Sequence, residues 1–236
     1  MMAHTGNRRR FVAMLAGVPA ASVGSRWFGS TAAAADDAAT PSVPADQGLQ
    51  MLIEGNKRFV ADTLTSLDSL VHERGQLASG QSPFAVIVCC SDSRVPPEII
   101  FDQPPGTLFV VRTAGQVIDE AARSSIVYGT DYLKAPLVLV LGHSQCGAVA
   151  ASLAAIKGET IPGYAYRLAE GIGSAVQSVL NEPGDQLDNA IRANIEWGVD
   201  QLQTAEPVLA ADVRSGQVTI AGGYYDLASG EVTFLA

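Results

Sequence analysis

The chain has 236 residues, which is long enough for one substantial domain with a well-buried core or for two small domains. Hydrophobic residues make up 47% of it and charged residues 17%, a balance typical of a globular protein and unlike that of an intrinsically disordered one. The formal net charge of −9 argues against nucleic acid and anionic membrane surfaces as partners.

The first 35 residues have the order of features found in export signals. Arg8-Arg9-Arg10-Phe11-Val12 precedes a modest apolar run from Met14 to Gly24, and a stretch of small residues follows from Thr31 to Ala35. Paired arginines ahead of Phe-Val are typical of the twin-arginine class. The apolar run is too short for a stable membrane span, and the alternatives are a basic tail or an uncleaved N-terminal anchor. We expect residues 1–35 to be a twin-arginine signal peptide that directs the protein to the periplasm, the cell wall or the medium.

The next segments lead into the folded domain. Residues 36–48 are rich in Ala, Asp and Pro without hydrophobic periodicity, so we expect a linker there. Apolar residues between Leu49 and Val60 recur at helical spacing and predict an amphipathic helix that ends near Ala61. Residues 65–82 are mostly polar and predict a loop, with or without a short helix. The expected domain therefore covers residues 49–236.

Three short apolar runs mark the predicted core: Phe84–Cys90, Leu108–Arg112 and Leu137–Leu141. Continuous runs of this length are typical of strands buried on both faces of a parallel sheet. Residues 120–134 predict a helix between the last two runs, and residues 96–101 predict at most a short one. Alternating strands and helices indicate an α/β fold with right-handed crossovers.

The C-terminal third continues with two helices and then two strands. Residues 166–180 and 187–202 have helical patterns, and residues 218–225 and 232–235 read as strands joined through a turn at Ser229-Gly230. We therefore expect a mainly parallel sheet, with about four parallel strands plus a C-terminal antiparallel strand, flanked by helices.

The residues with the clearest chemistry follow two of the predicted strands. Cys90 ends the first strand, and His143 and Cys146 follow the strand that ends near Leu141. Ligand sites of open α/β sheets form beyond the carboxyl ends of the strands, so these three side chains can meet there. Two thiolates and one imidazole are three of the four ligands of a tetrahedral zinc, and a catalytic zinc keeps its fourth position open. Asp92 and Arg94 lie in the loop after Cys90, where both can face the metal.

Simpler interpretations apply to each of these residues alone. A free cysteine is often just a buried small hydrophobic residue, and a single histidine is more often a core residue than a ligand. The combination of Cys90, His143 and Cys146 favours a metal site over these alternatives. Cys89 should face away from that site because successive strand side chains alternate between faces. Asp92 and Arg94 can form either a catalytic pair or an ion pair that only stabilises the loop.

The same residues resemble a known family. Cys-x-Asp-x-Arg followed by His-x-x-Cys is similar to the signature of the β-class carbonic anhydrases, and the likeness extends over residues 49–236. The positions that carry it are Gly55-Asn56-Lys57-Arg58-Phe59, Ser91-Asp92-Ser93-Arg94-Val95, Phe109-Val110-Val111-Arg112, Ala114-Gly115, Gly142-His143-Ser144-x-Cys146-Gly147 and Tyr225-Asp226 with Gly230.

The resemblance implies a zinc enzyme that converts carbon dioxide reversibly to bicarbonate and a proton through attack by zinc-bound hydroxide. It implies that Cys90, His143 and Cys146 hold the zinc and that Asp92 and Arg94 form a catalytic dyad. In the family's open form the arginine holds the aspartate away from zinc, and in its closed form the aspartate is the fourth ligand. It also implies a homodimer or homotetramer, because family members often complete their active sites across the dimer interface.

Two residues near the site have open roles. Several members of that family, including plant enzymes, place a glutamine before the Pro-Gly of the loop after the signature, where it donates to a substrate oxygen. Here Pro104 occupies that position and Gln103 stands one residue earlier. Arg112 follows a buried strand and is either a structural charge or an anion contact. The positions where bacterial closed-type members carry Trp and Gly are Ile87 and Cys89, which leaves the regulation of that type open.

Two other functions compete with carbon dioxide hydration. The same scaffold and zinc set can hydrolyse carbon disulfide or carbonyl sulfide, because each is a linear molecule attacked at carbon. A homologue can also keep the zinc and lose catalysis, although Asp92 and Arg94 argue against this. We expect carbon dioxide hydration.

Overall fold

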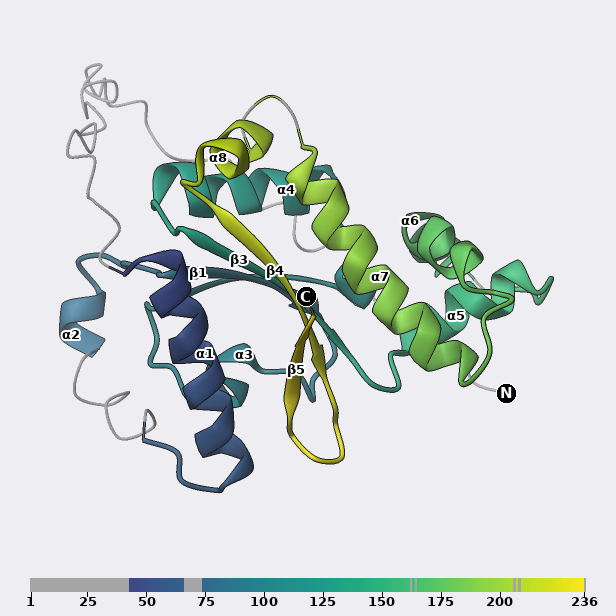
Figure 1. Ribbon diagram of the computed structural model, residues 1–236, viewed down its shortest axis with the longest axis horizontal. Helices are drawn as coiled ribbons and strands as arrows, with labels where there is room; N and C mark the ends of the chain where they lie inside the picture. Colours follow the sequence, from purple (N-terminus) through teal and green to yellow (C-terminus); the bar gives the residue numbers. More distant parts are fainter. Residues whose placement is uncertain are drawn as a thin grey trace, which may run out of the picture. The chain divides into compact units, whose positions relative to one another are not determined.

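Five strands form one sheet in the part of the chain that the structure describes (Figure 1). This computed structural model describes residues 43–65, 74–161, 163, 165–205, 207 and 209–235, so the predicted signal peptide and most of the predicted linker lie outside it. The strand order is β2-β1-β3-β4-β5. The strands are β1 (Ala85–Cys90), β2 (Leu108–Thr113), β3 (Leu137–His143), β4 (Thr219–Tyr225) and β5 (Val232–Leu235).

The first four strands are parallel and the last is antiparallel to its neighbour. β1 pairs in parallel with both β2 and β3, β3 pairs in parallel with β4, and β4 and β5 form an antiparallel pair. Every residue of β1 and β3 is buried, which explains why their sequences are continuous apolar runs rather than alternating ones. The predicted sheet is therefore confirmed.

Helices lie on both sides of this sheet (Figure 1). The described helices are α1 (Ala45–Val60), α2 (Arg74–Leu77), α3 (Pro97–Ile100), α4 (Glu120–Val127), α5 (Gly147–Ile156), α6 (Ala165–Ser178), α7 (Gln186–Gln203) and α8 (Leu209–Ser215), with short turns η2 (Ala114–Gln116) and η3 (Tyr128–Tyr132). None of them is both long and apolar enough to cross a membrane.

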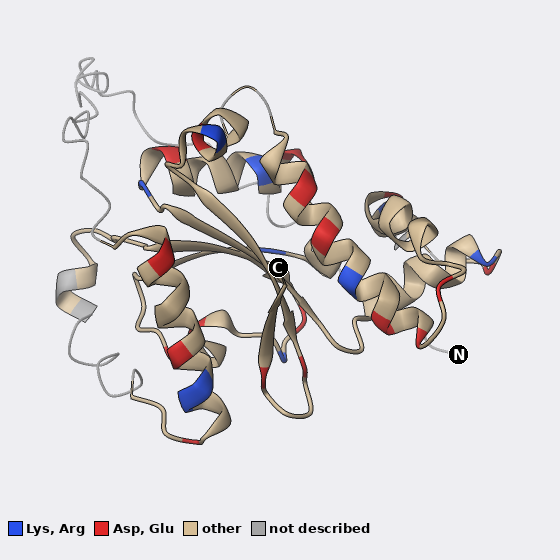
Figure 2. Ribbon diagram, viewed as in Figure 1, with Lys and Arg blue, Asp and Glu red and all other residues tan. Residues whose placement is uncertain are grey.

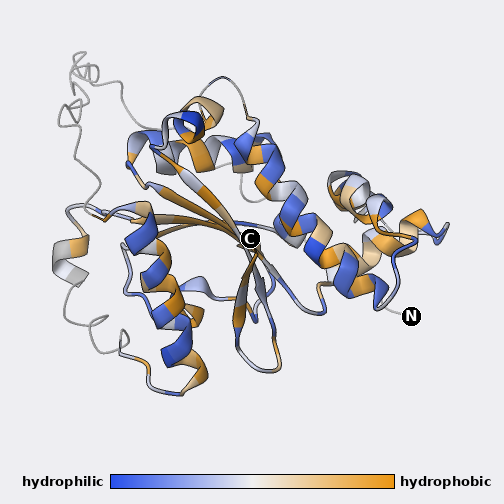
Figure 3. Cartoon of the chain, in the orientation of Figure 1, coloured by the Kyte–Doolittle hydropathy of each residue, from blue (hydrophilic) through white to orange (hydrophobic). Residues whose placement is uncertain are grey.

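The two faces of the sheet belong to two separate hydrophobic clusters. One cluster joins the sheet to α4, α5, α6, α7 and α8, and the other joins it to α1 and α3. Cys90 belongs to the first cluster and Cys89 to the second, as strand alternation predicts. Apolar residues concentrate in the strands and on the inner sides of the helices (Figure 3), so the chain forms a three-layer α/β domain.

Helix α1 is docked by close packing and by a buried carboxamide. Asn56 is 4% exposed; its Nδ2 donates to the carbonyl oxygens of Ile100 and Gly230, and its Oδ1 accepts from the Val232 N–H at 2.8 Å. Gly55 lies directly against the backbone of Phe101. These contacts tie α1 to the end of α3 and to the β4–β5 hairpin.

Several element boundaries differ from the sequence pattern. Helix α1 begins at Ala45, within the segment expected to be linker, because Pro44 fixes an extended conformation directly before it. The predicted helix over residues 120–134 is α-helical only to Val127 and continues as the π-type turn η3. Gly129 in that turn lies so close to Val86 that a side chain would clash with it. The turn therefore brings the backbone down onto the sheet where a regular helix would continue.

Candidate metal centre

Three ligand-type side chains from different elements meet at the carboxyl edge of the sheet. Cys90 is the last residue of β1, His143 is the last residue of β3, and Cys146 is the N-terminal cap of α5. Their ligand atoms lie within 4.8 Å of one another, and all three residues are buried. The sheet order explains the meeting, because β1 and β3 are neighbours although their ends are about fifty residues apart in sequence. The predicted grouping of these residues is present.

The histidine presents one nitrogen to this cluster. His143 is fully buried, and its Nδ1 lies 2.9 Å from the carbonyl oxygen of Ser144. A carbonyl oxygen can only accept a hydrogen bond, so Nδ1 carries the proton and Nε2 presents its lone pair. Nε2 has no hydrogen-bond partner among the described residues. A buried nitrogen lone pair without a partner, held in place through the opposite ring nitrogen, fits a metal ligand.

The side chains of Cys90 and Cys146 are hydrogen-bonded to each other. A hydrogen bond with Cys146 lowers the pKa of Cys90, and the hydrogen bond from the N–H of Gly115 acts in the same direction. The same pairing, together with burial, raises the pKa of Cys146. The cluster thus holds one sulfur readily as a thiolate, and the charge of a bound cation would favour the second. Two sulfurs and one nitrogen are a donor set that suits zinc.

Asp92 and Arg94 form a two-pronged ion pair beside the cluster. Arg94 Nε donates to Asp92 Oδ1 at 2.9 Å and Arg94 Nη2 donates to Asp92 Oδ2 at 2.7 Å. Asp92 Oδ2 also lies 3.9 Å from His143 Nε2, so the carboxylate borders the metal centre. The hydrogen bonds from Arg94 hold the pKa of Asp92 well below its usual range. The aspartate is therefore ionised and able to accept a hydrogen bond throughout the neutral pH range.

The structure shows a positioning contact for Arg112. Arg112 donates from Nε to the carbonyl oxygen of Cys90 at 3.1 Å and from Nη2 to that of Asp92 at 2.6 Å. These bonds fix the backbone of the loop that carries the first cysteine and the aspartate. This supports the interpretation of Arg112 as a structural charge.

The side chain of Gln103 is hydrogen-bonded to backbone carbonyls away from the metal centre. It is 6% exposed, and its Nε2 donates to the carbonyl oxygens of Phe101 at 2.9 Å and Met51 at 3.4 Å. Both partners belong to the α1 and α3 side of the domain. Gln103 therefore secures α1 in this structure.

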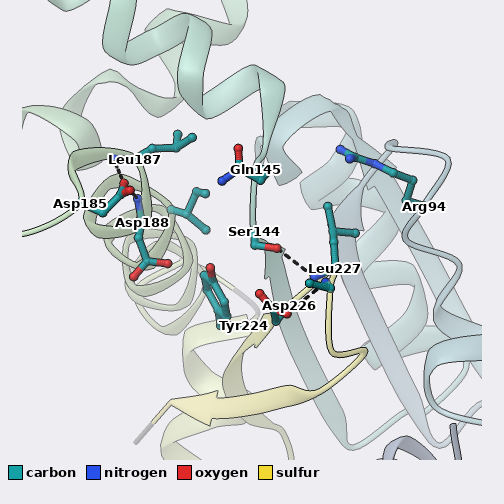
Figure 4. Close-up of a pocket in the computed structure, with 11 residues that line it drawn as sticks. Arg94, Ser144, Gln145, Asp185, Leu187, Asp188, Tyr224, Asp226 and Leu227 are labelled. Atoms are coloured by element: carbon teal, nitrogen blue, oxygen red, sulfur yellow. Dashed lines mark hydrogen bonds between the residues drawn. The ribbon is translucent and has the colours of Figure 1, made fainter. Parts of the chain in front are cut away.

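A cavity of about 640 Å³ lies next to the metal centre (Figure 4). Arg94, Ser144 and Gln145 line it, together with residues of α7 and of the β4–β5 turn. The two lining carboxylates at the start of α7 already have structural partners, since Asp185 caps the helix and Asp188 pairs with Arg192. Figure 2 shows further acidic residues along α7. Sequence reasoning did not connect α7 with the site, because nothing in its local pattern differs from that of an ordinary amphipathic helix.

Two further residues contact the candidate ligands; the sequence indicated them only as positions of the family resemblance and gave them no role. The carbonyl of Ser144 holds the His143 ring, while its hydroxyl accepts from the N–H of Leu227 at 2.9 Å. The N–H of Gly115 lies 3.2 Å from the Cys90 sulfur. The glycine in Ala114-Gly115 was a usable signal, because a glycine directly after a buried strand often marks a close backbone approach.

The comparisons with known proteins agree on one family. Residues 85–232 match the family model described as carbonic anhydrase. The chain is 42% identical to carbonic anhydrase 2 of Mycobacterium tuberculosis over 180 residues, which cover 76% of this chain and 87% of that protein. It is 39% identical to a carbonic anhydrase of Mycolicibacterium smegmatis over 182 residues, which cover 77% and 88% of the two chains.

Solved structures show the same likeness in three dimensions. The β-carbonic anhydrase CcaA superimposes with a TM-score of 0.65 at 28% identity, over 80% of this chain and 92% of that one. A Coccomyxa β-carbonic anhydrase in complex with acetazolamide gives a TM-score of 0.63 at 26% identity, over 79% and 86% of the two chains.

Proposed function

The chain belongs to the β-carbonic anhydrase family, and from that premise we propose that it hydrates carbon dioxide reversibly at a zinc ion held by Cys90, His143 and Cys146. The observation that carries the proposal is the cluster of three buried ligand atoms within 4.8 Å; one of them, His143 Nε2, has no hydrogen-bond partner among the residues that the structure describes. Zinc matches this donor set and leaves a fourth position for water or substrate. When bound there, it would supply a Lewis acid that makes a nucleophile from water near neutral pH.

Asp92 would orient the attacking group in this reaction. Its Oδ2 lies 3.9 Å from His143 Nε2. The carboxylate is therefore close to the position where the three ligand atoms would hold the zinc. Arg94 keeps Asp92 ionised and engages both of its oxygens, which fixes the direction of their remaining lone pairs. Asp92 Oδ2 can then accept a hydrogen bond from the attacking group and orient that group toward carbon dioxide. In a closed state, release of Arg94 would let Asp92 become the fourth ligand.

Stopped-flow carbon dioxide hydration with parallel metal analysis tests this function. Asp92→Asn should retain one zinc per chain and lose activity by about 100-fold or more, the usual contribution of a positioned acid–base group. Asp119→Asn is the matched control, because Asp119 is an exposed cap of α4 and Asn caps a helix as well as Asp does. Undiminished activity in Asp92→Asn would remove the dyad from the mechanism.

The same preparations separate the competing functions. Hydrogen sulfide release from carbon disulfide or carbonyl sulfide, without carbon dioxide hydration, would identify the alternative hydrolase. Zinc-loaded protein that hydrates no carbon dioxide up to about pH 9, where zinc-bound water has ionised, would identify a non-catalytic homologue. The intact pairing of Asp92 with Arg94 supports catalysis.

We further propose that the chain works as a homodimer or homotetramer. The outer edges of β2 and β5 have no strand beside them in the described part of one chain. Near β2, Tyr128 and Tyr132 stack at 5.3 Å between ring centroids and are 45% and 66% exposed. Open strand edges and exposed aromatic side chains favour association. Light scattering should give a mass of at least twice the 24.6 kDa of one chain, or of its processed form.

Export remains a proposal that rests on the sequence, because residues 1–35 lie outside the described residues. Replacing Arg8 and Arg9 together by Lys should leave full-length protein in the cytoplasm, whereas Arg26→Lys, outside the paired motif, should leave export intact. Fractionation and N-terminal sequencing of the exported form measure both effects. Equal export of the two variants would contradict a twin-arginine route.

A further inference from the structure

The turn that touches the Cys90 sulfur has an unusual backbone. Gly115 has φ +66° and Gln116 has φ +46°, so two successive residues adopt the left-handed conformation. For a residue other than glycine this conformation costs on the order of 1–3 kcal/mol, and it persists only where surrounding contacts enforce it. The result is that the N–H of Gly115 points at Cys90 Sγ, at 3.2 Å.

Close packing accounts for part of this enforcement. A Cβ atom on Gly115 would come within 2.7 Å of Ile172 and 2.9 Å of Ala148, so the turn sits tightly against α6 and α5. At the ends of the turn, the Thr113 hydroxyl donates to the carbonyl oxygen of Val117 at 2.8 Å. Neither contact determines the φ and ψ torsions of Gly115, which set the direction of its N–H relative to the peptide group that follows.

A hydrogen bond from α7 holds the peptide group between Gly115 and Gln116, which directly follows the peptide group whose N–H faces the sulfur. Asn194 Nδ2 donates to the carbonyl oxygen of Gly115 at 3.0 Å, and both groups are buried. Asn194 is 5% exposed and lies among the apolar core residues Ala190, Ile191 and Ile195 of the same helix. A carboxamide in such surroundings costs free energy unless it is bonded, so its contact with Gly115 is specific.

The side chain of Gln116 does not help to hold this turn through a hydrogen bond. Gln116 is 3% exposed, and neither of its side-chain polar atoms has a hydrogen-bond partner among the described residues. Its Nε2 lies against Gly142, where a Cβ atom would approach it to 3.2 Å. Asn194 is therefore the side chain that bonds the peptide group next to the one facing the sulfur, and it acts on the Gly115 N–H through the φ and ψ torsions of that residue.

We propose that Asn194 is a positioning residue of the metal centre, which acts through Gly115 to keep an N–H donor on the Cys90 sulfur. The donor withdraws electron density from a thiolate, so it limits the charge that Cys90 passes to the metal and preserves the metal's acidity. Hydrogen bonds to ligands commonly have this effect, and their loss costs about 10–100-fold in metal affinity or activity. The inference rests on the proposed metal site and adds α7 to its determinants.

Cobalt(II) binding to the purified whole protein tests the proposal. Asn194→Leu keeps a similar volume and removes the donor. We expect its sulfur-to-cobalt charge-transfer band to move to lower energy and its cobalt dissociation constant to rise about tenfold. Asn56→Leu is the matched control, since it also removes a buried carboxamide bonded to backbone but lies on the opposite side of the sheet. It should lose stability and leave the cobalt band in place.

The outcomes separate this inference from the proposed function. Wild-type protein that binds no cobalt would contradict the metal site itself. Wild-type binding with an unchanged band and affinity in Asn194→Leu would overturn the role of Asn194 alone. If Asn194→Leu does not fold, Asn194→Ala carries the same test, because it removes the donor without adding atoms to the core.

The hydrogen bond from Gly115 to the Cys90 sulfur can also be measured directly in the wild-type protein. In protein loaded with cadmium-113, the amide proton of Gly115 should show scalar coupling to the metal through the Cys90 sulfur. Absence of that coupling while the metal is bound would overturn the proposal.

Discussion

Two adjacent cysteines have opposite chemistry because they face opposite sides of one strand. Burial raises the pKa of Cys89 to about 12, so it stays a neutral thiol in the cluster beneath α1 and α3. Cys90, one residue later, has its pKa lowered by hydrogen bonds with Cys146 and with the N–H of Gly115. Residue type alone does not separate the two, and strand alternation does.

We expect the two cysteines to respond differently to the same substitution. Cys90→Ala removes one of three metal ligands and should abolish stoichiometric zinc, as measured by metal analysis after dialysis. Cys89→Ala should keep the zinc and lose only about 1 kcal/mol of stability from the small cavity. Zinc at full occupancy in Cys90→Ala, or its loss in Cys89→Ala, would contradict the assignment of the ligands.

The ion pair of Asp92 predicts how stability depends on pH. Arg94 depresses the pKa of Asp92 in the folded protein below the unfolded value of about 3.9. The stabilisation is therefore fully present above the unfolded pKa and is lost as the pH falls below it. The stability difference between wild type and Asp92→Asn should be constant between about pH 5 and 7 and should shrink toward about pH 3. Urea unfolding of metal-free protein at these pH values measures it, and a difference that grows on acidification would contradict the pairing.

At the scale of elements, the docking of α1 depends on one glycine. A Cβ atom on Gly55 would lie 1.7 Å from the carbonyl oxygen of Phe101, a backbone atom that no side-chain rotation can move. Gly55→Ala must therefore push α1 away from α3, and we expect a loss of about 3 kcal/mol or more in the free energy of unfolding.

Helix α6 supplies the matched control for that substitution. Gly173 lies in its interior with nothing within 4 Å of the position of a new Cβ atom. Gly173→Ala should stabilise the protein by about 0.5–1 kcal/mol through helix propensity. Denaturant unfolding measures both variants. Equal effects of the two substitutions would mean that backbone contact with Phe101 does not govern the docking of α1.

The sequence predicted the elements with a strong pattern and missed those without one. β1 and β3 are buried on both faces, so their continuous apolar runs identified them. Helix α5 is so rich in alanine and other apolar residues that it has no polar face to reveal its period, and α8 is only seven residues long. The β4–β5 pair was visible because a Ser-Gly turn separates two short strands.

The grouping of the candidate metal ligands was predictable for a similar reason, and their supporting contacts were not. Cys90 and His143 end strands that the fold class makes neighbours, so general rules for parallel sheets bring them together. Asn194 reaches Gly115 across 79 residues through packing of α7 on the turn, which no local spacing indicates. Long-range hydrogen bonds of this kind depend on tertiary structure alone.

At the scale of the whole molecule, the candidate metal centre joins β1 to the connection between β3 and α5. Its ligands come from the end of β1, the end of β3 and the start of α5, and all of them are buried. A metal bound there would cross-link the chain at three points and so close two loops, one from Cys90 to His143 and one from His143 to Cys146. The unfolded chain does not preform such a site, so binding adds directly to folding stability.

Metal removal should therefore lower the melting temperature substantially. With free zinc about 1,000-fold above its dissociation constant, binding contributes about 4 kcal/mol. For a domain of this size, that corresponds to a loss of about 8–16 °C when a chelator strips the metal. Calorimetry of zinc-loaded and chelated protein measures the difference. His143→Ala is the control, since without the buried imidazole the two samples should melt within a few degrees of each other. A chelator effect of equal size in His143→Ala would show that the stabilising metal binds elsewhere, because only a metal held at this centre depends on that side chain.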